Sequence, residues 1–381
     1  MKTLYYHQPH TLLNRALRLL QTIIQRKGIL SLFTTLTILL LPLSVQGQTS
    51  NKILINSGWE MQDAAIISKE GMKAGWEMEN AAKVPQEGKV ISTTKYKPSG
   101  WYKATVPGTV LTTLVNNGVY PEPLYGENNR PEVIPEYLCH TDWWYRNEVM
   151  IPDSYKNKTI WLNFDGINYS ADIWVNGHRV GPIKGAFIRG NFDITSFVKP
   201  GQTAIIAVRI SPQPNTGVPF EHIMGTVGGP CGGVGRLDGP TFGCSNGWDW
   251  LSGIRDRNSG IWQDVFLSAT GHVLMKDPLI TSDLPLPRTD IASVTVQTTV
   301  QNTTGNVQKG IIKGSFDSIK FEKTIEIAPW RSLTFTFDPK DFAQLNIKNP
   351  KLWWPNGLGE QNLYSMHLSF EIDGKISDEK K

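Results

Sequence analysis

The sequence contains few of the patterns that identify catalytic or metal-binding proteins. None of the seven histidines belongs to an HExxH pair, no segment forms a nucleophile elbow, and residues 228–239 lack the order of a phosphate-binding loop. The three cysteines give neither a CxxC pair nor a zinc-type spacing. These absences exclude the common metalloproteases, serine hydrolases and P-loop proteins, and we expect no metal and no cofactor.

Cysteine is too scarce to build a disulfide framework. With Cys139, Cys231 and Cys244 as the whole set, at least one thiol stays unpaired. Cys231 and Cys244 close a glycine-rich segment, so they either form a disulfide in an oxidising compartment or remain free, buried thiols. The sequence leaves both possibilities open.

A basic excess is absent from most of the chain. The formal net charge is +4, but residues 1–47 hold five basic residues and no acid. The remaining residues carry 33 bases against 34 acids, a net charge of −1. Nucleic acids and anionic membranes select basic surfaces, so we exclude both as partners of the mature protein.

The amino-terminal segment has the composition of a secretory signal. Its bases fall within residues 1–27, an apolar run broken by Pro42 follows at residues 29–45, and small residues precede a cleavage point after Gly47. We expect residues 1–47 to be removed and the mature protein to be secreted or periplasmic. An uncleaved anchor is the alternative, although the run falls short of the ~20 residues that a span needs.

The rest of the chain has the patterning of a β protein. Short apolar alternations, such as residues 159–164 and 203–210, are separated by Gly, Pro, Asn and Asp, and Asn176-Gly177 is a strong hairpin signal. Another strand is expected at residues 261–267, and one short helix at residues 109–117. We therefore predict an all-β protein.

The length of the chain favours two domains. One β-sandwich is expected at residues 48–270 and a second at residues 271–381, with a proline-rich connection over residues 271–287. Only five strands are expected after that connection, whereas an immunoglobulin-like sandwich has about seven. The Asp-Gly pair at 373–374 opens a turn whose return strand is not recognisable before Lys381. We therefore predict a truncated second domain.

The strongest functional signal is a run rich in tryptophan and charge. Asp249 lies between Trp248 and Trp250, and Arg257 and Asn258 follow within ten residues. A pyranose has an apolar face that stacks on aromatic rings and hydroxyls that carboxylate, guanidinium and amide groups bind. We predict a carbohydrate partner and substrate-binding roles for these five residues. The alternative is a structural corner in which the indoles pack in the core and the acid bonds to backbone.

Proline and glycine replace the strand pattern over residues 211–243. A loop of this length next to the tryptophan-rich run is expected to wall the binding site, with a solvated insertion as the alternative.

No residue of the sequence receives a catalytic role. Asn147-Glu148 has the form of a glycosidase acid signature, but it lies in an alternating strand from which Glu148 projects at a sheet surface. No other acid can be paired with a partner at the ~5 Å separation of a retaining glycosidase.

Four segments, in order, resemble glycoside hydrolase family 2, in particular its β-mannosidase and exo-β-glucosaminidase branches. They are residues 106–128, 142–177, 247–267 and 349–364. The resemblance implies a jelly-roll sugar-binding domain, an immunoglobulin-like domain, and a retaining exo-β-glycosidase that removes terminal β-linked mannose or glucosamine from glycans. It also implies that both catalytic glutamates belong to a (β/α)8 barrel that packs against these domains and that this sequence does not reach.

The resemblance assigns one residue in particular, because Asp249 matches the acid that grips hydroxyls of the terminal sugar. Leu251-Ser252-Gly253 departs from the mannosidase pattern, so the identity of the sugar stays open. We therefore expect an amino-terminal portion of the enzyme, which supplies one wall of the sugar pocket and has no activity alone. A stand-alone carbohydrate-binding module without catalysis is the alternative, and a structural remnant with a poorly covered apolar face is a third possibility.

Overall fold

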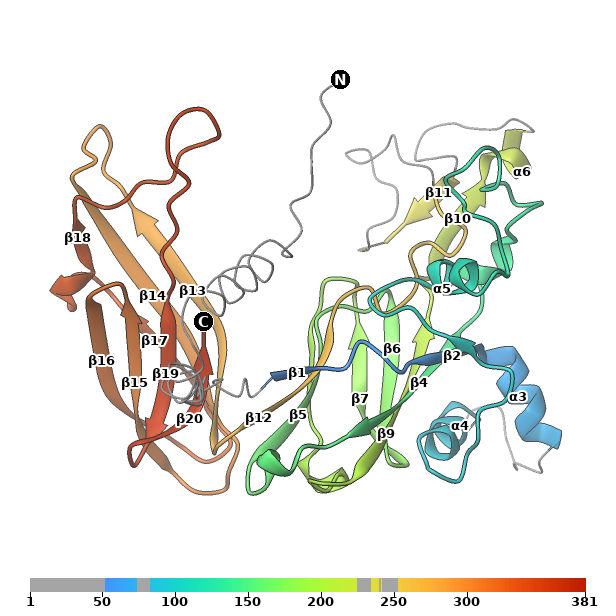
Figure 1. Ribbon diagram of the computed structural model, residues 1–381, viewed down its shortest axis with the longest axis horizontal. Helices are drawn as coiled ribbons and strands as arrows, with labels where there is room; N and C mark the ends of the chain where they lie inside the picture. Colours follow the sequence, from blue (N-terminus) through green and yellow to red (C-terminus); the bar gives the residue numbers. More distant parts are fainter. Residues whose placement is uncertain (1–51, 74–82, 225–233, 240, 242–252) are drawn as a thin grey trace, which may run out of the picture. The chain divides into compact units, whose positions relative to one another are not determined.

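The computed structural model describes residues 52–73, 83–224, 234–239, 241 and 253–381 (Figure 1). Most of its elements are antiparallel strands, and the predicted all-β fold class is confirmed. One hydrophobic core is formed by residues between Ile55 and Ala269, and another by residues between Val273 and Phe370. None of the helices in the described ranges has the length and apolarity to span a membrane.

The first sandwich consists of a four-stranded and a six-stranded antiparallel sheet. In spatial order, the four-stranded sheet contains β1 (Lys52–Leu54), β12 (Val265–Thr270), β5 (Thr159–Phe164) and β8 (Gly190–Asp193). The six-stranded sheet contains β3 (Tyr102–Lys103), β2 (Glu60–Asp63), β4 (Trp143–Met150), β9 (Thr203–Ser211), β6 (Ser170–Val175) and β7 (His178–Lys184). Apolar side chains from both sheets fill the core between them.

The hairpin and the short helix predicted from the sequence are both present. Asn176 and Gly177 join β6 to β7 with positive φ angles of 49° and 85°, as a type I′ turn requires. Helix α5 (Val110–Asn116) begins after Thr109, whose side-chain oxygen accepts a hydrogen bond from the Thr112 amide. Gly118 follows its end with a φ of 72°.

Two predictions for loop and strand boundaries are wrong. The strand expected at residues 261–267 begins only at Val265, because the Ile261 carbonyl accepts a hydrogen bond from Gly108 instead of joining the sheet. The expected loop at residues 211–243 contains a two-stranded ladder of β10 (Asn215–Pro219) and β11 (Val234–Asp238), and helix α6 (Phe220–Met224). These strands are short and contain glycine and proline, so they lack the alternation of apolar and polar residues that predicts a strand.

Helices α3 (Ala64–Lys73) and α4 (Lys83–Ile91) were not anticipated, because proline and glycine interrupt the apolar period of α4. Apolar residues of both helices pack in one cluster with Trp144 and Trp174 of the six-stranded sheet (Figure 1). These two indoles lie 5.2 Å apart, and Trp143 and Trp161 are buried as well. These four strand tryptophans therefore belong to the interior of the domain.

The second sandwich also consists of two antiparallel sheets. One contains β13 (Val273–Asp283), β14 (Ile291–Asn302) and β17 (Ser332–Phe337), with β18 (Asn346–Lys348) paired to β14. The other contains, in order, β16 (Ile319–Ile327), β15 (Gln308–Phe316), β19 (His367–Ile372) and β20 (Lys375–Lys380). Short 3-10 helices occur in both sandwiches, namely η2 (Glu136–Cys139), η3 (Asp153–Tyr155), η4 (Thr195–Phe197) and η5 (Ala343–Leu345).

The return strand that the sequence did not reveal is β20, which pairs with β19 directly after the Asp-Gly turn. Its sequence KISDEK is polar because two of its polar residues are buried against β13 rather than exposed. Ser377 Oγ accepts a hydrogen bond from the Val273 amide at 2.9 Å, and Asp378 Oδ2 accepts one from the Met275 amide at 2.8 Å. Strand β13 itself occupies most of the expected connection at residues 271–287. The prediction of five strands was therefore too low.

Candidate functional site

Several loops of the first sandwich lie at one end of its strands, which we call the loop end. Strand β5 ends and β12 begins at the pair Phe164–Val265, and β5 continues into β6 through residues 165–169. Ser170, the first residue of β6, pairs with Ser211 at the end of β9 and with Lys184 at the end of β7. The ends of β9 and β7 therefore lie beside the start of β6. The 253–264 segment, which carries predicted site residues, leads into β12 at this end.

Three of the five predicted sugar-binding residues, Trp248, Asp249 and Trp250, lie outside the described residues, as do Cys231 and Cys244. Arg257 and Asn258 are described, and both have positive φ angles, of 52° and 57°. They form a tight turn within residues 253–260, where Arg257 is buried and Asn258 is half-buried.

Arg257 points into the protein and binds acceptors of the protein itself. Its Nη2 lies 2.6 Å from Glu136 Oε2, and its side chain is only 2% exposed. Its Nε donates to the Thr216 carbonyl at 2.7 Å and its Nη1 to the Ile254 carbonyl at 3.0 Å. A guanidinium with its donors used in this way holds the turn in place, which is a supporting role.

Glu136 also binds a second arginine of the same turn. Arg255 Nη1 lies 2.9 Å from Glu136 Oε1, and the Arg255 side chain is 2% exposed. One carboxylate therefore forms ion pairs with two buried guanidinium groups. Burial of the two guanidinium groups is tolerated because each is paired with Glu136, so this cluster fixes η2 against the turn.

Asp256, between the two arginines, attaches the turn to helix α5. Its Oδ2 accepts a hydrogen bond from the Leu111 amide at 2.6 Å, and its Oδ1 accepts one from the Asn258 amide at 2.9 Å. Burial raises the pKa of the Asp256 carboxyl, while hydrogen bonds from Thr109, Leu111 and Asn258 act in the opposite direction. The carboxylate thus caps the first turn of α5 from a distant part of the chain.

Asn168, in the loop between β5 and β6, holds the turn from the other side. Its Nδ2 donates to the carbonyls of Arg257 and Asn258, both at 3.0 Å, and its backbone bridges to Gly260. Its Oδ1 accepts a hydrogen bond from Thr241 Oγ1 at 2.6 Å. The Asn168 side chain is almost fully buried, so this amide is a fixed part of the loop end.

The two described residues that flank positions 242–252 are both anchored to this cluster. Thr241 is held by Asn168, and the Gly253 carbonyl accepts a hydrogen bond from Asn129 Nδ2 at 3.0 Å. Asn129 Oδ1 in turn accepts a weak hydrogen bond from Arg255 Nε at 3.4 Å. Thr241 and Gly253 are therefore both held by side chains of the first sandwich.

Among the described residues, Glu136, Cys139 and His140 bring three possible metal ligands within 4.8 Å of one another. The Glu136 carboxylate already forms ion pairs with two arginines, and burial raises the pKa of the Cys139 thiol. A cation would compete with two fixed positive charges for that carboxylate, and it would need a thiolate that burial disfavours. The donor set therefore does not favour a metal.

Glu148 lies where the alternation of β4 predicts it. Its side chain is 52% exposed, and its carboxylate binds the buried Arg146 at 2.8 Å. The acid thus belongs to the surface of the six-stranded sheet and stabilises the charge of Arg146.

The sequence alone does not reveal Glu136 and Asn168, the two residues that organise the described part of the site. They lie 121 and 89 residues before Arg257. Neither stands in a recognisable motif, and only the tertiary fold brings them to the turn.

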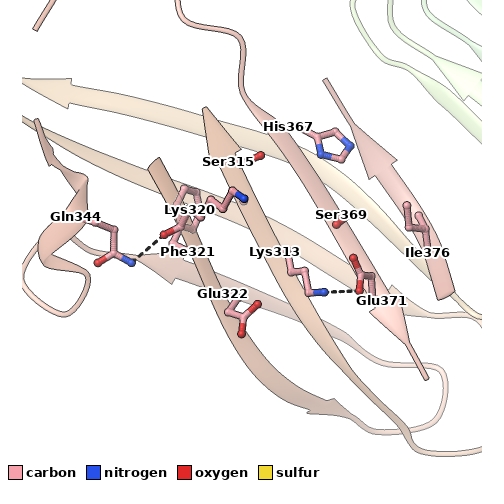
Figure 2. A pocket seen from close by; sticks show the side chains of 11 residues that line it. Lys313, Ser315, Lys320, Phe321, Glu322, Gln344, His367, Ser369, Glu371 and Ile376 are labelled. Carbon is pink, nitrogen blue, oxygen red and sulfur yellow. Dashed lines mark hydrogen bonds and ion pairs between the residues drawn. The ribbon is translucent and has the colours of Figure 1, made fainter. Parts of the chain in front are cut away.

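A cavity of about 490 Å³ lies on the outer face of the second sandwich (Figure 2). Its side chains are polar and partly satisfy one another, as in the 2.5 Å ion pair between Lys313 and Glu371 and the hydrogen bond from Gln344 to the Lys320 carbonyl. Of its two ring side chains, Phe321 is 3% exposed and His367 Nε2 lies 2.8 Å from Glu379 Oε2, so the cavity presents no tryptophan or tyrosine face to a sugar.

Comparisons with known families assign both sandwiches. Residues 76–263 match a model described as glycosyl hydrolase 2 galactose-binding domain-like, and residues 273–381 match the model of glycosyl hydrolases family 2. The chain belongs to glycoside hydrolase family 2. The family 2 chain therefore contains a galactose-binding-like domain followed by an immunoglobulin-like domain, and the resemblance seen in the sequence is confirmed.

Similar proteins include glycosidases of different specificity. The family 2 chain is 30% identical over 292 residues to an exo-beta-D-glucosaminidase of Streptomyces avermitilis, which covers 76% of this chain and 29% of that protein. It is 33% identical over 309 residues to a mannosylglycoprotein endo-beta-mannosidase of Lilium longiflorum, over 74% of this chain and 30% of that protein. The chain thus spans less than a third of the length of these curated relatives.

Solved structures share the fold. The exo-chitosanase of Amycolatopsis orientalis has a TM-score of 0.66 at 24% identity, over 87% of this chain and 33% of that chain. Beta-glucuronidase 2 of Bacteroides uniformis has a TM-score of 0.54 at 18% identity, over 86% of this chain and 31% of that chain.

Proposed function

We propose that this chain is the amino-terminal part of a retaining exo-β-glycosidase that removes terminal β-linked sugars of the mannose or glucosamine type from glycans. Its role is to supply one wall of the sugar pocket, in which Asp249 binds hydroxyls and Trp248 and Trp250 offer ring faces. Family membership and the glucosaminidases and mannosidases among the relatives support this proposal.

The observation that carries the proposal is the ion-pair cluster in which Glu136 binds the buried Arg255 and Arg257. Two buried guanidinium groups and a half-buried carboxylate are costly to assemble in a loop region, and apolar contacts of similar volume would stabilise the fold equally well. They hold the turn that follows positions 248–250 in one geometry, which a sugar-binding carboxylate needs. In this proposal Arg257 supports the site through Glu136, and Asn258 supports it through the turn.

The proposed chemistry is divided between parts of the enzyme. In a retaining glycosidase one carboxylic acid protonates the leaving oxygen, while a second carboxylate forms and releases a glycosyl intermediate. No acid of this chain is assigned either role, and we place both in a further domain of the enzyme; the chain spans less than a third of the length of its curated relatives. We expect no turnover of aryl β-glycosides by the chain alone.

Binding of simple glycosides tests the role of Asp249. Titration calorimetry with methyl β-D-glucosaminide and methyl β-D-mannoside should detect binding of one of them, and Asp249→Ala should weaken it at least tenfold. Asp283→Ala, at an exposed position of β13, is the matched control and should bind like the wild type. Equal affinity in both variants would contradict the proposed role of Asp249.

We also propose that residues 1–47 are a signal peptide and that the protein is secreted or periplasmic. The apolar run and the basic head support this assignment. Mass spectrometry of the protein from its native host should find an amino terminus at Gln48. A mature protein that retains Met1 or Lys2 would contradict it.

A carbohydrate-binding module without catalysis is the second candidate, favoured by the match of residues 76–263 to a galactose-binding domain-like model. Sequencing the coding region beyond Lys381 separates the two candidates. An in-frame barrel supports the enzyme, whereas a native stop codon together with glycan binding by this chain supports the module.

A further inference from the structure

A tryptophan-rich hairpin at residues 349–364 projects from one end of the second sandwich (Figure 1). Trp353 and Gln361 form an antiparallel bridge across it, and the Trp354 amide donates to the Glu360 carbonyl at 2.9 Å. Four apolar side chains of this hairpin are between 44% and 85% exposed, and we call them the hairpin patch: Trp353, Trp354, Leu358 and Leu363. So many large apolar side chains exposed in one short segment indicate a binding surface.

Hydrogen bonds within the hairpin fix its shape. Gln361 Nε2 donates to the carbonyls of Trp354 and Gly359, at 3.0 and 2.8 Å. The Leu358 amide donates to the Pro355 carbonyl at 2.9 Å. A Cβ added at Gly359 would lie 2.6 Å from Trp354 Cδ1, so the backbone packs directly on the indole. The hairpin patch is therefore preformed, and little conformational entropy is lost when a partner packs on it.

The base of the hairpin is attached to the second sandwich. The Asn349 amide donates to the Asp290 carbonyl at 2.7 Å, and the Lys351 amide donates to Tyr364 Oη at 2.7 Å. The Tyr364 ring packs edge to face on Phe316, which is buried in the core, with the ring centroids 5.9 Å apart. The hairpin patch is thus fixed relative to the core of the second sandwich.

The chemistry of the hairpin favours an apolar protein surface as its partner. Residues 352–363 contain a single charged side chain, Glu360. The amide groups of Gln361 and Asn362 donate to backbone carbonyls of the hairpin itself, so they do not supply donors to a polar ligand. In the cores of protein interfaces charged residues are depleted, and tryptophan is enriched. The hairpin patch has this composition.

The size of the hairpin patch decides between a separate protein and a domain of the same polypeptide. The exposed parts of its four side chains amount to roughly 500 Å² of apolar surface, whereas a stable complex of separate proteins buries about 800 Å² on each partner. A linked domain needs less, because the linkage holds it at an effective concentration of about millimolar. The relatives leave room for such a domain, since this chain spans 29% of the Streptomyces avermitilis glucosaminidase and 33% of the Amycolatopsis orientalis exo-chitosanase.

We propose that the hairpin patch is the docking surface for a folded domain that follows Lys381 on the same polypeptide and presents an apolar surface to it. The inference rests on the proposed function for the existence of that domain. It adds the surface of the second sandwich that holds the domain in place. A second copy of this chain and a separate protein are the other occupants that the test distinguishes.

Oxidative footprinting of two proteins tests the inference, namely this chain and the product of the coding region extended beyond Lys381. Hydroxyl radicals should oxidise Trp353 at least fivefold more slowly in the extended product than in this chain. Trp330 is the matched control, because it is 68% exposed and its amide bonds to Thr304, beyond the opposite end of β14 from Asp290. Its oxidation rate should be equal in the two proteins.

A charge placed in the hairpin patch gives a second measurement. Leu363→Asp should lower the thermal midpoint of the extended product, because an unpaired charge is then buried in the contact. The same variant of this chain should keep its midpoint, since the side chain is 85% exposed. Val307→Asp, at a 52% exposed position before β15, is the control and should leave both midpoints unchanged.

The outcomes separate this inference from the proposed function. If the extended product hydrolyses aryl β-glycosides while Trp353 is oxidised equally in both proteins, the inference fails and the proposed function stands. If Trp353 is protected but the extended product hydrolyses nothing, the docking surface is supported and the proposed function fails.

Two further results would overturn the inference. Protection of Trp353 in this chain alone, together with a dimer in analytical ultracentrifugation, would identify a second copy as the occupant. A native stop codon directly after Lys381 would remove the linked domain altogether.

Discussion

Arg257 Nη2 lies 2.6 Å from Glu136 Oε2, although the two residues are 121 positions apart in the sequence. The other oxygen of Glu136 binds Arg255 at 2.9 Å, and both arginine side chains are 2% exposed. The turn that carries two predicted sugar-binding residues therefore depends on one acid of η2. Replacement of this acid should therefore change the free energy of unfolding.

Glu136→Gln should destabilise the first sandwich strongly. The amide keeps the shape of the carboxylate but removes the ion-pair partner of two buried guanidinium groups, at a cost of about 3 kcal/mol. Chemical denaturation measures the free energy of unfolding. Glu127→Gln is the control, because Glu127 is 73% exposed in its pair with Arg130 and should change stability by less than about 0.5 kcal/mol. Equal effects of the two variants would show that the pairing of Glu136 contributes nothing.

Local patterns predicted the elements that depend only on neighbouring residues. The Asn176-Gly177 hairpin, strand β5 and helix α5 each carry their turn residue, alternation or cap within a few positions. Strand β20 was missed because its polar residues Ser377 and Asp378 are satisfied by β13, more than 100 positions away. Alternation cannot reveal a strand whose buried side is polar.

In the candidate site, too, some features follow from the local sequence and others from contacts with distant residues. The sequence identified Arg257 and Asn258 by their residue types, but the direction of a side chain in a turn is set by tertiary contacts. Arg257 points inward because Glu136, Thr216 and Ile254 provide acceptors there. The predictions for Trp248, Asp249 and Trp250 remain untested, because these residues lie outside the described ranges.

Asp256→Asn should change how stability depends on pH. Burial raises the pKa of Asp256 in the folded state, so between about pH 4 and that pKa the folded state binds more protons than the unfolded state. The stability that this residue contributes is therefore present below about pH 4 and is lost as pH rises through the folded pKa. The difference in unfolding free energy between the wild type and the variant should fall over that interval.

Urea denaturation at intervals of half a pH unit from pH 4 to pH 8 measures this difference. Asp283→Asn, at an exposed end of β13, serves as the control. A difference for Asp256→Asn that grows with rising pH would contradict the raised pKa.

Gly260→Ala should be more costly than an ordinary glycine substitution. Gly260 has a φ of 152°, and a Cβ there would lie 2.5 Å from the Gly108 carbonyl oxygen, which belongs to the backbone and cannot rotate away. Gly100 has a φ of 70° but no atom within 4 Å of its Cβ position. Gly100→Ala should cost about 1–2 kcal/mol from backbone strain alone. Gly260→Ala should add a further 1–3 kcal/mol or so for the clash.

Thermal unfolding followed by near-ultraviolet circular dichroism measures both glycine variants, because several tryptophans of the first sandwich are buried. Similar midpoints for the two variants would mean that the contact between Gly260 and Gly108 relaxes freely.

Ser377→Ala tests whether β20 completes the second sandwich. Ser377 Oγ accepts from the Val273 amide at 2.9 Å and donates to the Val273 carbonyl at 2.8 Å, and the serine is 5% exposed. Alanine removes both bonds and leaves two buried backbone groups of β13 unsatisfied, so the cost should be about 2–4 kcal/mol. Ser332→Ala, at an exposed position of β17, should change stability by less than about 0.5 kcal/mol. If Ser377→Ala unfolds at the same denaturant concentration as Ser332→Ala, then β20 does not stabilise β13, and the second sandwich is held together by its apolar core alone.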